Sequence, residues 1–129
     1  MPTILVVDDD TAIRTMLARA LAQQGTVEQA ADGVAALKLL GGKKYDLVLL
    51  DLHMPGVDGF AVLKVLGKKA TGPNAGTPVF VVTADPSEHA RVTAFHDGAV
   101  YFLSKPIRMA TLTTFVQSTL KKSLAQKPG

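Results

Sequence analysis

Residues 45–59 read YDLVLLDLHMPGVDG, an apolar run that ends on the carboxylate of Asp51 and then breaks into a turn. A short aliphatic run bounded by turn residues is typical of a strand that is buried on both faces of a sheet. In open parallel sheets, ligands bind in the crevice outside the carboxyl ends of the strands. Asp51 is therefore well placed for chemistry, although an aspartate at this point is also suited to capping the segment that follows.

Five runs of apolar or β-branched residues have the character of strands. They cover residues 3–7, 47–50, 79–82 and 100–103, with a weaker run at 26–28. Between them lie stretches with apolar residues at helical spacing, which run from Ile13 to near Gly25, then over 35–40, 60–66 and 86–96, with a last stripe over 112–120. Because parallel strands need crossovers of about a dozen residues, this alternation predicts a single α/β domain, a doubly wound five-stranded parallel sheet with five helices.

Turn and capping residues predict where two of these helices begin and end. Residues 85–88 read DPSE, which predicts a helix start with Asp85 as the cap, Pro86 in the first helical position and Glu88 reaching back. Gly67 predicts the end of the preceding helix, because glycine adopts a positive φ without steric cost. Residues 70–78 are rich in Gly and Pro and predict a long irregular loop.

The composition fits one globular domain with a sizeable core, since 47% of the 129 residues are hydrophobic. The absence of cysteine excludes disulfides and thiolate metal sites and favours a reducing, cytoplasmic location. The first apolar run has the length of a strand, and no segment reaches the roughly 20 apolar residues that cross a bilayer, so we expect neither a signal peptide nor a membrane span. The net charge of +3 is mild, and we expect no direct binding of nucleic acid.

Polar side chains that follow four of the strands should meet at one edge of a parallel sheet. They are Asp8, Asp9 and Asp10 after the first strand, Asp51 after the third, Thr83 after the fourth and Lys105 after the fifth. Carboxylates gathered at short range repel one another, and a hard divalent cation relieves this repulsion. Oxygen ligands suit Mg²⁺, so Asp8, Asp9 and Asp51 are its predicted ligands, whereas Asp10 also fits a helix cap.

Lys105 and Thr83 offer the cationic donor and the hydroxyl donor that a phosphoryl group needs. Asp51 can then act as a nucleophile and form an aspartyl-phosphate. Taken alone, Lys105 also fits an ordinary surface lysine, and Thr83 an ordinary strand residue. Their expected convergence on one edge of the sheet favours phosphoryl chemistry.

Four motifs in this order resemble the response-regulator receiver domains of two-component phosphorelay signalling. They are ILVVDDD at 4–10, DLHMPGVDG at 51–59, VTA at 82–84, and GA at 98–99 followed by KP at 105–106. The resemblance covers almost the whole chain and implies a CheY-like, flavodoxin-like sheet with the strand order 2-1-3-4-5. It also implies a receiver domain over residues 1–124, with 125–129 as a C-terminal tail or the start of a linker.

The same resemblance implies how the acidic residues act. Asp51 accepts a phosphoryl group from a phosphohistidine on a histidine kinase or a histidine phosphotransfer protein. Mg²⁺ is the implied cofactor, bound by Asp8, Asp9 and Asp51 together with the backbone carbonyl of His53.

Residues near the ends of the fourth and fifth strands take the other implied roles. Thr83 and Lys105 contact the phosphoryl oxygens, and the peptide bond between Lys105 and Pro106 is expected to be cis. Thr83 and Phe102 are the switch pair, with Phe102 at the position where the family often has tyrosine. Phe102 lacks the tyrosine hydroxyl, so either a rotation between exposed and buried states or static packing fits it.

Two further residues are implied to tune the lifetime of the phosphoryl group. His53 and Asp85 stand two residues after the acceptor and the threonine, and their side chains are expected to border the attacking water. The plainer alternative is that His53, His89 and His96 are all ordinary surface residues.

The predicted function is a phosphorylation-dependent signalling switch and not an enzyme in its own right. Phosphorylation is expected to change the face formed by the fourth helix, fifth strand and fifth helix, which controls an unidentified output partner. The main alternative is a receiver that belongs to a longer regulator or hybrid kinase with a downstream effector domain. Two other possibilities are a phosphatase of the haloacid-dehalogenase type, which needs a second aspartate where His53 stands, and an interaction module that is never phosphorylated.

Overall fold

The structure, a computed structural model, describes residues 1–66, 71–85 and 87–126, the last four by their backbone alone. Gly67 and Pro86, which the sequence assigns to a helix end and a helix start, lie outside the described residues. The end of the predicted tail, residues 127–129, lies outside them as well. No helix in the described part of the chain is long and apolar enough to cross a membrane.

Strands and helices alternate along the described chain. In order they are β1 (Thr3–Val7), α1 (Thr11–Leu21), β2 (Thr26–Ala30), α2 (Gly33–Gly42), β3 (Leu47–Leu50), α3 (Gly59–Lys64), β4 (Val79–Thr83), α4 (Glu88–His96), β5 (Tyr101–Ser104) and α5 (Met109–Gln126). The strands pair in parallel in the order β2-β1-β3-β4-β5. This arrangement confirms the predicted doubly wound sheet, its five helices and the strand order that the resemblance implied.

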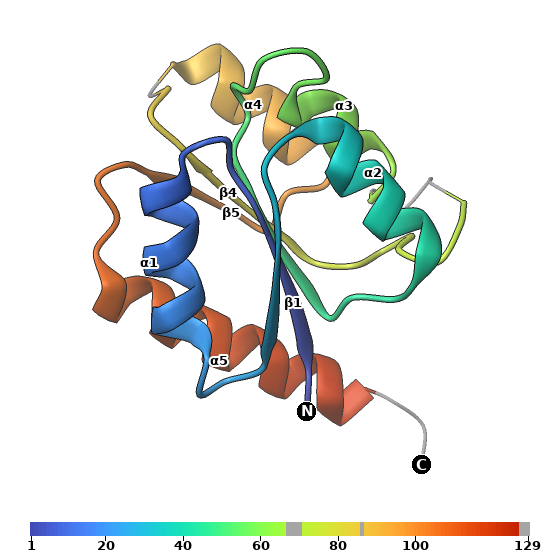
Figure 1. The fold of residues 1–129 in the computed structure, drawn as a ribbon, viewed down its shortest axis with the longest axis vertical. Helices are drawn as coiled ribbons and strands as arrows, with labels where there is room; N and C mark the ends of the chain where they lie inside the picture. The colour runs from blue at the N-terminus through green and yellow to red at the C-terminus, as the bar shows by residue number, and fades with distance from the viewer. Residues whose placement is uncertain (67–70, 86, 127–129) are drawn as a thin grey trace.

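The helices cover both faces of the sheet (Figure 1). One face packs against α1 and α5, whose buried leucines and valine join Leu47 and Leu49 of β3 in one core cluster. The other face packs against α2, α3 and α4, and here Val48 and Leu50 of β3 join the second cluster. Every side chain of β3 is thus buried, alternately on the two faces, which is why this strand reads as an unbroken apolar run.

The weakest predicted strand is the one that the structure extends most. β2 continues to Ala30, because Glu28 and Gln29 pair with Leu5 and Val6 in the ladder with β1. Polar residues are common on an edge strand, where one side of the strand has no neighbour. They interrupt the apolar run, so hydrophobicity alone predicts too early an end for the strand.

The predicted cap of α4 is wrong. Ser87, and not Asp85, caps the helix, with its hydroxyl oxygen 3.1 Å from the amide nitrogen of Ala90. The carboxylate of Asp85 instead accepts from the amide of Ser87 and from the ring of His53. With both oxygens engaged outside the helix, Asp85 leaves the capping role to the next residue that has a side-chain acceptor.

The irregular loop before β4 is anchored by one buried asparagine. The side-chain amide of Asn74 donates to the backbone carbonyls of Leu40 and Lys43, each at 2.7 Å. Its oxygen accepts from the amide of Tyr45 at 2.8 Å and from the hydroxyl of Thr77 at 3.1 Å. A loop of this length keeps a defined path because the asparagine satisfies backbone groups on the neighbouring segment.

Candidate functional site

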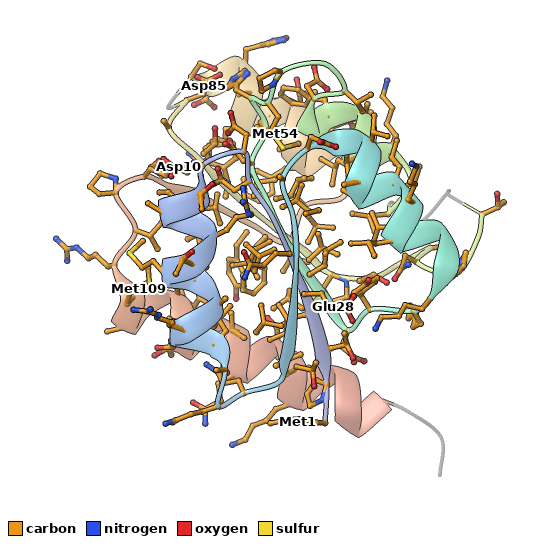
Figure 2. All side chains as sticks on the ribbon, viewed as in Figure 1. Met1, Asp10, Glu28, Met54, Asp85 and Met109 are labelled. Carbon is orange, nitrogen blue, oxygen red and sulfur yellow. The ribbon has the colours of Figure 1, made fainter. Side chains whose placement is uncertain are left out.

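The parallel register brings the acidic residues together at the carboxyl end of the sheet. Val7 pairs with Leu50, so the residues that follow, Asp8 and Asp51, lie side by side, and the amide of Asp51 donates to the carbonyl of Val7 at 3.0 Å. Figure 2 shows the labelled Asp10 and Asp85 toward this end of the molecule, with Met1 at the opposite end.

Three carboxylates form what we call the acidic cluster: Asp8, Asp9 and Asp51. One oxygen from each lies within 4.8 Å of the other two. Asp8 and Asp51 are buried, with 2% and 5% of their surface exposed, whereas Asp9 is exposed. The donor set fits a hard divalent cation such as Mg²⁺, because all three ligands are carboxylate oxygens and the exposed member leaves a side open to water.

Asp10, the next acidic residue, does not belong to this cluster. Its carboxylate caps α1 and accepts from the amides of Ala12 at 2.9 Å and Ile13 at 3.2 Å. The capping alternative that the sequence left open for Asp10 is therefore correct.

Lys105 links the two buried carboxylates. Its ammonium nitrogen lies 2.8 Å from Oδ2 of Asp8 and 3.2 Å from Oδ2 of Asp51. Its amide donates to the carbonyl of Thr83 at 2.8 Å, which extends the ladder between β4 and β5 by one residue. The peptide bond between Lys105 and Pro106 is cis.

The pKa values of these groups reflect their burial and their proximity. Burial raises the pKa of the Asp8 carboxyl, against the opposing effects of the hydrogen bonds from Lys105 and from the amide of Asp10. Burial alone lowers the pKa of Lys105, but its hydrogen bond to Asp8 and the charges of Asp51 and Asp8 together raise it. Lys105 thus stays charged, while Asp8 carries an electrostatic cost that a bound cation relieves.

Thr83, His53 and Asp85 lie around the ends of β3 and β4. Thr83 is the last residue of β4 and is fully buried, and its hydroxyl oxygen accepts from the amide of Asp85 at 3.2 Å. The amide of His53 points back to Oδ1 of Asp51 at 3.3 Å. All three residues therefore lie at the end of the sheet where Asp51 stands.

His53 and Asp85 also contact each other, a pairing that sequence reasoning did not predict. Nε2 of His53 lies 2.6 Å from Oδ2 of Asp85, and the ring lies edge-on to Phe60. The hydrogen bond from His53, followed by the one from the amide of Ser87, lowers the pKa of Asp85 to about 2. Residues 32 positions apart give no local sequence signal of such contact. His89 and His96 are exposed on α4, as the plainer reading of the histidines expects.

Phe102 lies half-buried on β5 and packs against the core cluster below α4. Its ring centre is 6.4 Å from that of Phe95, which is 41% exposed on α4. Tyr101 points to the other face of the sheet, where its ring stacks on Phe115 at 4.5 Å. Of the two neighbouring aromatics, only Phe102 therefore faces α4.

Arg14 is the residue at this site that sequence reasoning missed. Its Nη1 donates to the backbone carbonyl of Asp8 at 2.7 Å. The available signal was its position one turn into the helix that follows the acidic run.

Gly59 allows α3 to begin against the residue that follows β3. A Cβ atom on Gly59 would lie 2.1 Å from the carbonyl oxygen of Asp51 and 2.6 Å from Cα of Leu52. The amide of Gly59 donates to the carbonyl of Leu52 at 2.9 Å. Only a residue without a side chain fits this approach, so Gly59 sets the course of the turn after Asp51.

Most of the chain is similar in sequence to proteins of one family. The family model described as the response regulator receiver domain matches residues 4–117. Response regulator MprA from Mycobacterium sp. (strain KMS) is 40% identical over 121 residues, which cover 93% of this chain and 51% of that protein. The chain thus spans about half the length of this curated relative.

Two solved structures show the same architecture. The Francisella response regulator 1452 receiver domain is 30% identical with a TM-score of 0.84, covering 95% of this chain and 99% of that one. A response regulator protein from Burkholderia pseudomallei, solved with a phosphorylated aspartic acid, calcium ion and citrate, is 28% identical with a TM-score of 0.77. That match covers 98% of this chain and 72% of the other.

We predict that Gly59→Ala lowers the free energy of unfolding by about 2 to 3 kcal/mol, because the methyl group forces the backbone at Asp51 to move. Gly41→Ala in α2 is the matched control, since a Cβ atom there meets nothing within 4 Å. This control should be neutral or stabilise the protein by about 0.5 kcal/mol. Urea unfolding of the three proteins measures both effects, and equal stability of the two variants would contradict the close approach.

Proposed function

The chain belongs to the response-regulator receiver family, and we propose that it is a phosphorylation-dependent signalling switch whose acceptor is Asp51. The observation that carries this proposal is the position of the Lys105 ammonium between Asp51 and Asp8, at the edge where Asp9 completes the acidic cluster. As a receiver domain, the chain is not a classical enzyme.

In the proposed reaction, a carboxylate oxygen of Asp51 attacks the phosphorus of a phosphohistidine on a histidine kinase or phosphotransfer protein. A P–O bond forms to Asp51 and the P–N bond breaks, with its electron pair staying on the ring nitrogen, so that a histidine protonated at its other ring nitrogen leaves as neutral imidazole. Lys105 and the hydroxyl of Thr83 contact the phosphoryl oxygens and stabilise their negative charge. A phosphorylated aspartic acid in the Burkholderia relative supports this chemistry.

Mg²⁺ is the proposed cofactor. Asp8, Asp9 and Asp51 would hold it, with the backbone carbonyl of His53 as a further ligand, and its charge would screen the approach of an anionic donor. The raised pKa of Asp8 supports this assignment, because a site that disfavours its own negative charge gains from a bound cation.

The proposed output runs through Thr83 and Phe102 to the face formed by α4, β5 and α5. A phosphoryl group on Asp51 draws Thr83 inward, and Phe102 follows, which favours a minor conformation that an output partner binds better. The burial of α4 supports this route: its buried residues are two alanines, Ala90 and Ala94. A helix that packs through small side chains shifts at low cost.

The extent of the protein and its location are also proposals. We place the receiver over residues 1–124 and regard 125–129 as a tail or the start of a linker. A receiver joined to a downstream effector domain is the main alternative, supported by the relatives that are about twice as long. A reducing cytoplasm, where a kinase presents its phosphohistidine, suits a chain without cysteine.

The two competing functions have less support. A phosphatase of the haloacid-dehalogenase type needs a second aspartate where His53 stands. A module that is never phosphorylated has no need for a half-buried lysine between two carboxylates, yet Lys105 holds that place.

We predict that Asp51→Asn abolishes labelling by acetyl phosphate or by a phosphorylated kinase, because the amide is a poor nucleophile. Asp32→Asn is the matched control: Asp32 is exposed and caps α2, a role that asparagine also fills. The control should be labelled like the wild type. Labelling of Asp51→Asn at another residue would overturn the assignment of the acceptor.

We predict that His53 and Asp85 tune the phosphoryl lifetime as one unit, because their side chains bond to each other beside the acceptor. His53→Ala or Asp85→Ala should speed the loss of phosphate by a factor of about three, and the double variant should be no faster than either one. His96→Ala serves as the control, because His96 is the last residue of α4 and its ring pairs with the neighbouring Asp97. Independent, multiplying effects of the two substitutions would contradict the proposal.

A further inference from the structure

Each polar atom of Asp8 has a partner. Its amide donates to the carbonyl of Ala30 at 3.2 Å, Oδ1 accepts from the amide of Asp10 at 2.9 Å, and Oδ2 accepts from Lys105 at 2.8 Å. β1 ends at Val7, so the carbonyl of Asp8 lies beyond the sheet ladder. That carbonyl accepts from the guanidinium of Arg14 at 2.7 Å. Arg14 thus supplies the hydrogen bond that the sheet does not give to the backbone oxygen of Asp8.

The guanidinium of Arg14 holds both ends of the turn between β1 and α1. Nη1 bonds the carbonyl of Asp8, while Nη2 lies 3.3 Å from the hydroxyl of Thr11. The amide of Arg14 makes the first bond of the helix, to the carbonyl of Asp10 at 3.0 Å. A planar group with fixed donors bridges two acceptors in this way more rigidly than an ammonium does.

These two bonds of Arg14, which we call the Arg14 clamp, enclose Asp8 and Asp9, the members of the acidic cluster that follow β1. Asp9 lies between Asp8 and Asp10 in the clamped turn, and its carboxylate is the exposed member of the cluster. The position of its oxygen relative to those of Asp8 and Asp51 depends on the path of this turn. Fixing the turn therefore fixes the spacing of the three oxygens before any cation arrives.

The positive charge of Arg14 does not explain why this residue lies beside the acidic cluster. A cation on the first turn of a helix faces the positive end of the helix dipole, and it repels a divalent cation bound nearby. A charge role and a geometric role thus predict opposite signs: removal of Arg14 strengthens Mg²⁺ binding in the first case and weakens it in the second.

We propose that Arg14 is a positioning residue, which acts through the backbone carbonyl of Asp8 to hold the acidic cluster in the spacing that binds Mg²⁺. This inference rests on the proposed function. It means that Arg14, which is not a metal ligand, contributes to the affinity for Mg²⁺.

The test compares Arg14→Gln and Arg14→Lys with Arg19→Gln, which removes the same charge from an exposed position on the same helix. Titration calorimetry of the unphosphorylated protein should show that Arg14→Gln raises the Mg²⁺ dissociation constant by about tenfold. Arg14→Lys should recover part of the affinity, since an ammonium can reach one of the two acceptors. Arg19→Gln should bind like the wild type.

Two further measurements separate positioning from general stability. Thermal unfolding in EDTA reports the fold without metal, where Arg14→Lys and the wild type should differ by only a few degrees. The rate of labelling by acetyl phosphate should fall for Arg14→Gln at low Mg²⁺ and recover at saturating Mg²⁺, because Arg14 touches neither the phosphoryl group nor the acceptor.

Equal or tighter Mg²⁺ binding by Arg14→Gln would overturn the inference. A lower unfolding temperature with unchanged Mg²⁺ affinity would also overturn it, because Arg14 would then only stabilise the fold. A wild-type protein that binds no Mg²⁺ at all would overturn both this inference and the proposed function.

Discussion

Two buried carboxylates side by side repel each other, and in this protein the ammonium of Lys105 lies within reach of both. Asp8 and Asp51 lie at the ends of neighbouring central strands, and Lys105 reaches them from the end of β5. The three residues come from positions far apart in the chain and meet only when the sheet is complete. The compensation is partial, because burial still leaves the pKa of Asp8 raised. The folded domain therefore holds an excess of negative charge at this edge of the sheet, which favours a bound cation.

The rest of the fold keeps this edge in register. β3 is buried on both faces, so a slip of its pairing would move side chains between two separate core clusters. Gly59 lets α3 start directly against the carbonyl of Asp51, and Arg14 closes the turn that carries Asp8 and Asp9. Both contacts lie beside the acidic cluster. On the α4 side of the sheet the packing is lighter, because α4 buries two alanines and Phe102 meets a half-exposed Phe95.

Local pattern was enough to predict the strands, the helices and the edge on which Asp8, Asp51, Thr83 and Lys105 lie, because apolar periodicity and parallel topology determine them. The strand order could not be predicted in this way, because periodicity does not indicate which strands are neighbours. It was predicted correctly from the family resemblance. The cap of α4 was wrong because Asp85 bonds a histidine from another loop. A pairing between distant side chains of this kind leaves no trace in local sequence. The bond from Arg14 to the carbonyl of Asp8 is local, and the position of Arg14 one turn into α1 was its only sequence signal.

The buried charge of Asp8 should cost the fold stability until a cation binds, and the unfolding of Asp8→Asn with and without Mg²⁺ tests this cost most directly. In Mg²⁺-free buffer the variant should be more stable than the wild type, because removing the desolvated charge outweighs the loss of one hydrogen bond: the single amide oxygen of asparagine accepts from Lys105 or from the amide of Asp10, but not from both. Mg²⁺ a hundredfold above its dissociation constant should stabilise the wild type by about 2.7 kcal/mol and leave the variant almost unchanged. A variant that is less stable without Mg²⁺, or that gains as much from Mg²⁺ as the wild type does, would contradict the account.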